Sequence, residues 1–161
     1  MDRKALIKKL ESELRQAHQD YLDGKGIPLE EFDWGLPLQI AESQTEYRVQ
    51  NEAWTQIELT PTAYFQIKSI YNYIANNLLN EPASYNMKHT IENKLSTIST
   101  FPNAGTFIIL VSDDISEEFS NVQRRIAKNY IILYRYYEDT DIAFITHIFH
   151  QTQDYSKVFR K

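Results

Sequence analysis

The sequence predicts an α+β fold: an antiparallel sheet of three to four strands plus an N-terminal strand, packed on an α-helical hairpin and wrapped by an N-terminal helix and an extended strap. Residues 122–150 carry the strongest strand signal, with three runs rich in Ile, Tyr and Phe separated by polar residues at 127–129 and 138–141. Alternate residues of the middle run are largely apolar or aromatic on both faces, which indicates a strand covered from both sides. Two amphipathic stretches precede these strands and predict the helices that pack on the sheet.

The composition is that of one domain with an appendage. The chain has 161 residues, of which 42% are hydrophobic and 24% charged, and folding at this size can bury a core of its own. No run approaches the roughly 18 apolar residues that a membrane-spanning helix needs, and no cationic start precedes an apolar block as in a secretory signal. We therefore expect a cytoplasmic protein without a membrane partner. The absence of cysteine excludes disulfides, thiolate metal sites and a cysteine nucleophile.

A first helix is predicted over residues 2–22, where apolar residues recur every three or four positions. The members of this stripe are Leu6, Leu10, Leu14, Ala17 and Tyr21. Gly24 follows, and glycine accepts the left-handed conformation that ends a helix. Because the stripe is narrow, the helix is expected to bury little apolar surface alone.

The next segment, residues 27–41, has two prolines, a glycine and large apolar side chains without a helical or strand period. This pattern favours an extended strap laid across another surface, and the alternative is a core loop of the same domain. Residues 46–50 alternate polar and apolar and are a short strand candidate that could pair with a sheet edge. The predicted anchors of this segment are Leu29, Phe32, Trp34, Leu36, Leu38, Tyr47 and Val49.

Residues 54–111 predict a strand, two helices and a further strand. Strand 54–59 points Ile57 and Leu59 inward, and Thr60-Pro61 supplies a hydroxyl cap followed by proline at the first helical position. The helices are predicted over 61–79 and 82–99, and their short connection predicts an antiparallel hairpin. The stretch FPNAG at 101–105 stops the second helix, and FIILV at 107–111 is a candidate short buried strand.

Charge is distributed unevenly along the chain. Residues 23–53 hold seven acidic and two basic residues, whereas residues 122–161 hold seven basic and four acidic ones. Opposite charge on two segments of one chain predicts that the acidic strap docks on the basic sheet. The basic residues predicted to contact the strap or a target are Arg124, Arg125, Lys128 and Arg135, and the first two are expected to face opposite sides of the sheet.

The order of these elements, with FPNAG after the second helix, YIILYR on a central strand and IFHQTQDYSKVF at the end, resembles the RelE/ParE superfamily of bacterial toxins over residues 55–159. Residues 1–50 resemble the toxin-binding end of a ParD/RelB-like antitoxin. The resemblance implies an antitoxin-like segment at 1–50, a short linker at 51–53 and a toxin domain at 54–161. The segment would mask the toxin in cis, or exchange with a second chain to give a homodimer.

The superfamily contains ribosome-dependent messenger RNA endonucleases and inhibitors of DNA gyrase. Metal-free RNA cleavage needs a base, a cation and an acid, and the resemblance implies an arginine three residues before the central-strand tyrosine. Tyr134 occupies the tyrosine position, but Ile131 occupies the arginine position. His150 and Asp154 match the His-x-x-x-Asp ending of ParE-like chains. The resemblance therefore favours a gyrase inhibitor, which works by binding and needs no catalytic set.

The alternatives that stay open are the messenger RNA endonuclease and an interaction module without toxic action. Weak catalytic candidates for the endonuclease are Arg124, which matches a basic position one strand earlier, Tyr134, His150 and Asp154. His147 and His150 are three residues apart on a strand and would point to opposite faces, so no metal site is predicted. No cofactor is expected.

Overall fold

The computed structural model describes residues 2–32, 55–74 and 81–159, apart from the side chains of Glu81, Ser84 and Asp154. Its α-helices are α1 (Arg3–Leu22), α3 (Pro61–Asn72) and α4 (Glu81–Thr100), and its strands are β1 (Ile27–Pro28), β2 (Gln56–Leu59), β3 (Thr106–Phe107), β4 (Val122–Ala127), β5 (Tyr130–Tyr137) and β6 (Ile142–His150). Short 3₁₀ helices are η1 (Leu29–Glu31), η3 (Ile108–Leu110), η4 (Glu117–Phe119) and η5 (Asp154–Phe159). The predicted strand 46–50, the linker 51–53 and the anchors Trp34, Leu36, Leu38, Tyr47 and Val49 lie outside the described residues.

Six strands form one mixed sheet in the order β1-β2-β6-β5-β4-β3. The meander β4-β5-β6 is antiparallel, as predicted. The pairing of β2 with β6 is parallel, so the prediction of an antiparallel sheet with three to four strands and one N-terminal strand is wrong in direction at this edge and in the number of strands. Parallel pairing is possible because α3 and α4 carry the chain across the sheet between β2 and the meander.

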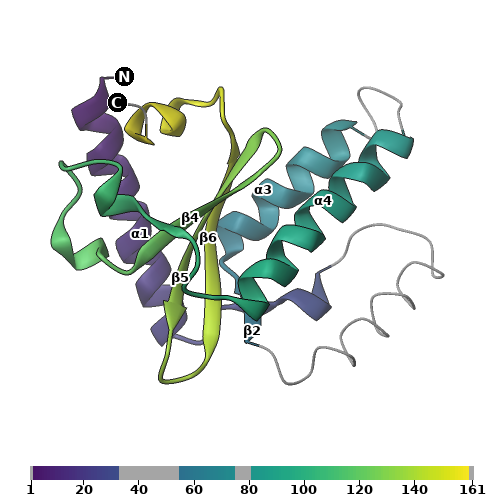
Figure 1. Ribbon diagram of the computed structural model, residues 1–161, viewed down its shortest axis with the longest axis horizontal. Helices are drawn as coiled ribbons and strands as arrows, with labels where there is room; N and C mark the ends of the chain where they lie inside the picture. The colour runs from purple at the N-terminus through teal and green to yellow at the C-terminus, as the bar shows by residue number, and fades with distance from the viewer. Residues whose placement is uncertain (1, 33–54, 75–80, 160–161) are drawn as a thin grey trace.

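The sheet is covered on both faces (Figure 1). Helices α3 and α4 lie together on one face, where they enclose a hairpin-side core, and α1 lies on the other face above an α1-side core. Alternate residues of β5 serve different cores: Ile132 and Tyr134 belong to the hairpin side, and Ile131 and Leu133 to the α1 side. The prediction that the middle run of the meander is covered from both sides is confirmed.

Local sequence signals determine where several elements begin and end. The Asp2 side chain accepts a hydrogen bond from the Ala5 N–H and caps α1, and Gly24 follows that helix with a φ of +71°. The Thr60 hydroxyl accepts from the Ala63 N–H at the start of α3, with Pro61 at the first helical position as predicted. The α-helical part of α3 ends at Asn72 and is followed by a π-helical turn at residues 73–74, and the predicted helix end at residue 79 lies outside the described part of the chain.

The predicted strand over 107–111 is wrong beyond Phe107. The backbone turns into η3 instead, and the N–H groups of Val111 and Ser112 both return to the Ile108 carbonyl. Ile108 is fully buried while Leu110 is 68% exposed. A short apolar run does not distinguish a strand from a helical turn, because its periodicity is too brief to read.

Candidate functional site: the sheet face beneath the N-terminal helix

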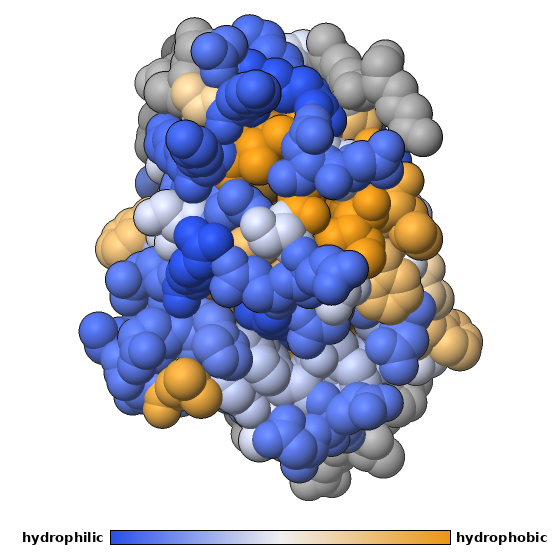
Figure 2. All heavy atoms as spheres, turned by 90° about the vertical axis from the view of Figure 1, so that its left-hand side faces the viewer, coloured by the Kyte–Doolittle hydropathy of each residue, from blue (hydrophilic) through white to orange (hydrophobic). Residues whose placement is uncertain are grey.

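Helix α1 closes one face of the sheet with its apolar stripe. Leu6, Ile7, Leu10 and Leu14 are each at most 4% exposed. Their three- and four-residue spacing places them on one side of the helix. The residues that they join in the α1-side core, drawn from the sheet and from η3, η4 and η5, include Ile108, Phe119, Val122, Ile131, Leu133, Phe149, Val158 and Phe159. The side of the molecule that carries α1 is largely hydrophilic toward solvent (Figure 2).

After α1 the chain crosses the β2 edge of the sheet and reaches the opposite face. A Cβ at Gly26 would lie 2.2 Å from Glu58 Oε1 and 2.6 Å from the Phe144 ring, so the crossing is too close for a side chain. Strand β1 pairs with β2, and Phe32 then lies 5% exposed in the hairpin-side core, 4.8 Å from the Tyr64 ring. The described strap therefore contacts an edge of the sheet, and the N-terminal segment contacts both faces. Leu29 packs beside the hairpin-side core as well.

The charged rim of this interface joins basic residues of α1 to an acidic loop. Arg3 and Arg15 of α1 form ion pairs with Asp114 and Glu118 in the acidic loop before β4. Glu30 and Glu31 of the strap add negative charge beside Glu58. Burial and the charge of Glu30 raise the pKa of Glu58. In the described residues α1 therefore contributes cations to an acidic loop. The predicted docking of the acidic strap on the basic sheet stays a prediction, because four of the seven acidic residues of the strap lie outside the described residues.

A polar cluster of Glu13, His147 and Tyr155 lies within the α1-side interface. The Tyr155 hydroxyl lies 2.6 Å from both carboxylate oxygens of Glu13, and His147 Nε2 lies 3.5 Å from Glu13 Oε1. Burial raises the pKa of Glu13, but the imidazole of His147, the hydroxyl of Tyr155 and the ammonium of Lys9 together hold it below its ordinary value. Burial and the Glu13 carboxylate raise the pKa of Tyr155, which therefore remains a donor.

Aromatic residues close the C-terminal end of α1. The rings of Tyr21 and Tyr137 stack with centroids 3.6 Å apart, and His18 Nδ1 lies 2.7 Å from the Tyr137 hydroxyl. Burial raises the pKa of Tyr137 to about 12. Burial, with the charge of Arg135, lowers the pKa of His18. The imidazole and the phenol therefore share a hydrogen bond at this end of the helix.

The predicted basic contacts lie on both sides of the sheet. The Arg124 guanidinium lies 5.9 Å from the Phe159 ring on the α1 side, whereas Arg125 donates to the Phe101 carbonyl at 3.4 Å on the hairpin side. Arg135 donates to Asn121 Oδ1 and to the Glu118 carbonyl. Lys128 is exposed in the β4-β5 turn with a φ of 54°. Described side chains therefore place Arg124 and Arg135 beside the α1 face and Arg125 away from it.

The catalytic candidates are not brought together. Tyr134 is fully buried in the hairpin-side core, where its hydroxyl lies 3.1 Å from the Pro102 carbonyl and 2.9 Å from Gln123 Oε1. Burial raises its pKa. His150 Nδ1 lies 2.7 Å from Thr152 Oγ1, and the His150 ring contacts Tyr130 on the hairpin side of the sheet. Arg124 lies on the α1 side, and the Asp154 side chain lies outside the described atoms.

The residues that sequence analysis missed are Glu13, Tyr155 and the role of His147. A signal for Glu13 exists in the sequence, since a charged residue three positions after Leu10 and one before Leu14 interrupts the apolar face of a predicted helix. The partners on the sheet side carry no comparable signal. Their proximity depends on the docking of α1 against β6 and η5.

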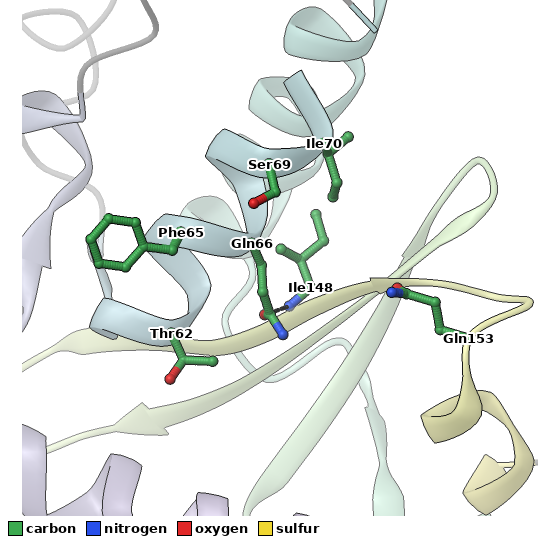
Figure 3. Close-up of a pocket in the computed structure, with 7 residues that line it drawn as sticks. All are labelled: Thr62, Phe65, Gln66, Ser69, Ile70, Ile148 and Gln153. Carbon is green, nitrogen blue, oxygen red and sulfur yellow. Dashed lines mark hydrogen bonds between the residues drawn. The ribbon is translucent and has the colours of Figure 1, made fainter. Parts of the chain in front are cut away.

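An open groove of about 450 Å³ lies between α3 and the end of β6 (Figure 3). Its lining consists of Thr62, Phe65, Gln66, Ser69, Ile70, Ile148 and Gln153. Strand β2 ends opposite Ile145, and beyond it glutamine side chains accept the β6 N–H groups: Gln66 Oε1 from Ile148 and Gln153 Oε1 from His150. The lining contains amides, hydroxyls and apolar groups but no acid or base, so the groove is suited to binding and not to proton transfer.

Within the described ranges, no three or more His, Asp or Glu side chains are grouped as metal ligands. His147 and His150 face opposite sides of the sheet, as their spacing predicted. No helix in the part of the chain that the structure describes is long and apolar enough to cross a membrane.

Residues 57–155, which span β2 to the start of η5, match the family model described as ParE toxin of type II toxin-antitoxin system, parDE. This match, on an α+β domain with a helical hairpin and a meander, defines a toxin of the type II toxin–antitoxin class, whose members pair with an antitoxin. The chain belongs to the ParE toxin family. A comparison with curated proteins gave no match.

Proposed function

We propose that this protein is a ParE-type toxin that binds and inhibits DNA gyrase, and that residues 1–50 are an antitoxin segment that holds it inactive. The observation that carries the proposal is the position of α1. This helix precedes the residues that match the toxin family, yet it covers one face of the matched sheet. A helix followed by chain that pairs at a sheet edge is part of what the resemblance to ParD/RelB-like antitoxins implies, and the added strand expected at 46–50 lies outside the described residues.

The energetics support masking of this face. Full burial of one large aliphatic side chain is worth about 1.5–3 kcal/mol, and four such side chains of α1 are buried against the sheet side. Because the segment is covalently attached, its effective concentration is in the millimolar range or above. The toxin face beneath α1 is therefore closed to a target until the helix leaves.

The placement of the catalytic candidates supports binding over cleavage. Ile131, at the position where the endonuclease branch implies an arginine, is 6% exposed in the α1-side core. Tyr134 lies on the other side of the sheet with its hydroxyl already bonded. The described side chains thus support an inhibitor that acts through a surface. A gyrase inhibitor acts in the bacterial cytoplasm, which we propose as its location.

The test compares the full-length protein with a variant whose helix cannot stay docked. Leu10→Asp/Leu14→Asp places two carboxylates in the α1-side core, and Lys8→Asp adds one on the exposed side of the same helix as the control. In a supercoiling reaction with purified gyrase, the intact protein and the control are expected to leave supercoiling unchanged. The double variant is expected to inhibit it.

Each other outcome assigns a different function. Normal supercoiling with a variant whose α1 amides exchange freely contradicts the gyrase target. Messenger RNA cleavage by that variant in a translating extract supports the endonuclease, and harmless expression with neither effect supports a non-toxic interaction module. Light scattering decides whether the segment acts within one chain or is exchanged in a homodimer.

A further inference from the structure

We propose that the toxin face selects its masking helix through the Glu13 carboxylate, which Tyr155 and His147 receive within the α1-side interface. The partner that this surface fits is an amphipathic helix with a carboxylate three residues after a buried leucine and one residue before the next. This inference rests on the proposed function in that it treats α1 as the antitoxin helix. It concerns how the helix is recognised, not what the toxin does afterwards.

The apolar contacts of α1 do not discriminate between helices. Leu6, Leu10 and Leu14 follow a spacing that any amphipathic helix reproduces. The ion pairs of Arg3 and Arg15 lie at the exposed rim, with side chains 39% to 61% exposed, and such surface pairs contribute little. Discrimination is therefore expected from polar groups within the interface. One is Glu11, whose Oε2 accepts the Ser116 N–H at 2.9 Å, but a backbone N–H is present on any chain, so the side chains that face Glu13 carry more information.

His147, which is buried, and Tyr155, which is partly buried, are the side chains that face Glu13. The His147 side chain is 1% exposed, and its Nε2 has no hydrogen-bond partner among the described residues. The Thr146 hydroxyl donates to the Leu133 carbonyl at 3.2 Å, so its lone pair receives Nδ1–H of His147, also at 3.2 Å. This arrangement leaves Nε2 on the side of Glu13, 3.5 Å from Oε1, where it attracts the carboxylate when both ring nitrogens carry a proton.

Tyr155 completes the receptor for the carboxylate. It lies in η5, which follows β6 and packs against α1, and its hydroxyl reaches both Glu13 oxygens at 2.6 Å. Lys9, one helical turn before Glu13, lies 5.6 Å from the centroid of the Tyr155 ring and adds positive charge. A helix with an apolar residue in place of Glu13 leaves the partly buried Tyr155 hydroxyl without its acceptor and removes the negative charge beside Nε2. An unsatisfied polar group inside an interface is costly.

The test is a mismatch-and-rescue series in the full-length chain. Glu13→Leu removes the carboxylate, Tyr155→Phe/His147→Leu removes its receptors, and the triple variant combines both changes into an apolar match. Asp20→Asn is the control, because Asp20 is another carboxylate of α1 and its side chain contacts Gln16 of the same helix. Hydrogen–deuterium exchange is measured for the amides of α1, with the amides of β5 as the internal standard for folding.

We expect Glu13→Leu to raise α1 exchange about tenfold or more, with β5 unchanged. The receptor variant raises it less, because the Glu13 side chain is 34% exposed and can turn to water. The triple variant returns to within about threefold of the wild type, since a buried polar cluster can be replaced by apolar groups at little cost. A purely structural role of Glu13 gives no such rescue.

The proposal is overturned if Glu13→Leu opens α1 no more than Asp20→Asn does, or if the triple variant exchanges as fast as Glu13→Leu. Growth of cells that express the same variants separates this result from the proposed function. If Glu13→Leu opens α1 and growth continues, recognition by the carboxylate stands and the toxin-masking role fails. If α1 stays closed, the recognition proposal fails while the masking role is unaffected.

Discussion

Leu10→Ala provides the most direct measure of how tightly α1 is held on the sheet. Leu10 is 1% exposed at the middle of the apolar stripe. Removing the side chain of a leucine this deeply buried costs about 2–5 kcal/mol. If the cost falls on docking, the equilibrium for release of α1 increases roughly 30- to 4,000-fold. Leu22→Ala is the matched control, because Leu22 is in the same helix and 60% exposed, and its change is expected to stay within about 0.5 kcal/mol.

The assay is hydrogen exchange of the full-length protein, followed separately for α1 and β5 peptides. Fast exchange of α1 with continued protection of β5 is expected, because β5 is held by β4 and β6 on either side and by the hairpin-side core. Two results refute the reasoning. Unchanged α1 exchange would mean that the stripe does not hold the helix, and a parallel rise in β5 would mean that α1 cannot leave without global unfolding.

Three further predictions test individual side chains. Tyr134→Phe is expected to lower the free energy of unfolding by about 1–2 kcal/mol in urea titration without changing the toxicity of a helix-released variant, and lost toxicity at full stability would restore Tyr134 as a catalytic residue. Because the pKa of His18 is lowered in the docked state, α1 docking is complete above the ordinary histidine pKa and weakens as the pH falls below it. The variant His18→Gln is expected to reduce this pH dependence in hydrogen exchange of α1 measured from about pH 5.5 to 7.5. A variant with the same dependence as the wild type would contradict the role of His18. Gly105→Ala places a Cβ 2.6 Å from the Tyr134 hydroxyl and 3.0 Å from the Arg124 carbonyl. The free energy of unfolding is therefore expected to fall by about 1–3 kcal/mol in the same urea titration. Unchanged stability would show that the backbone around Gly105 moves to accept the methyl group.

The pattern of local features in this sequence determined much of the fold. The meander follows from alternation in residues 122–150, because side chains of a strand point to opposite faces and both faces here are apolar. Thr60-Pro61 starts α3, and Gly24 follows the end of α1, because capping depends on hydrogen bonds and backbone angles within a few residues. The apolar stripe of α1 likewise identified which side of that helix is buried.

Long-range packing decided the rest. Whether Ile108 continued a strand or began a helical turn depended on the space beneath α1, and the parallel pairing of β2 depended on where α3 and α4 returned the chain. Tyr134 occupied the position that suggested catalysis, yet the sheet turns it toward the hairpin and the FPNAG turn. Glu13 meets His147 and Tyr155 across more than 130 residues of sequence. Such contacts are set by the docking of whole elements, and the residues that make them carry no local trace of one another.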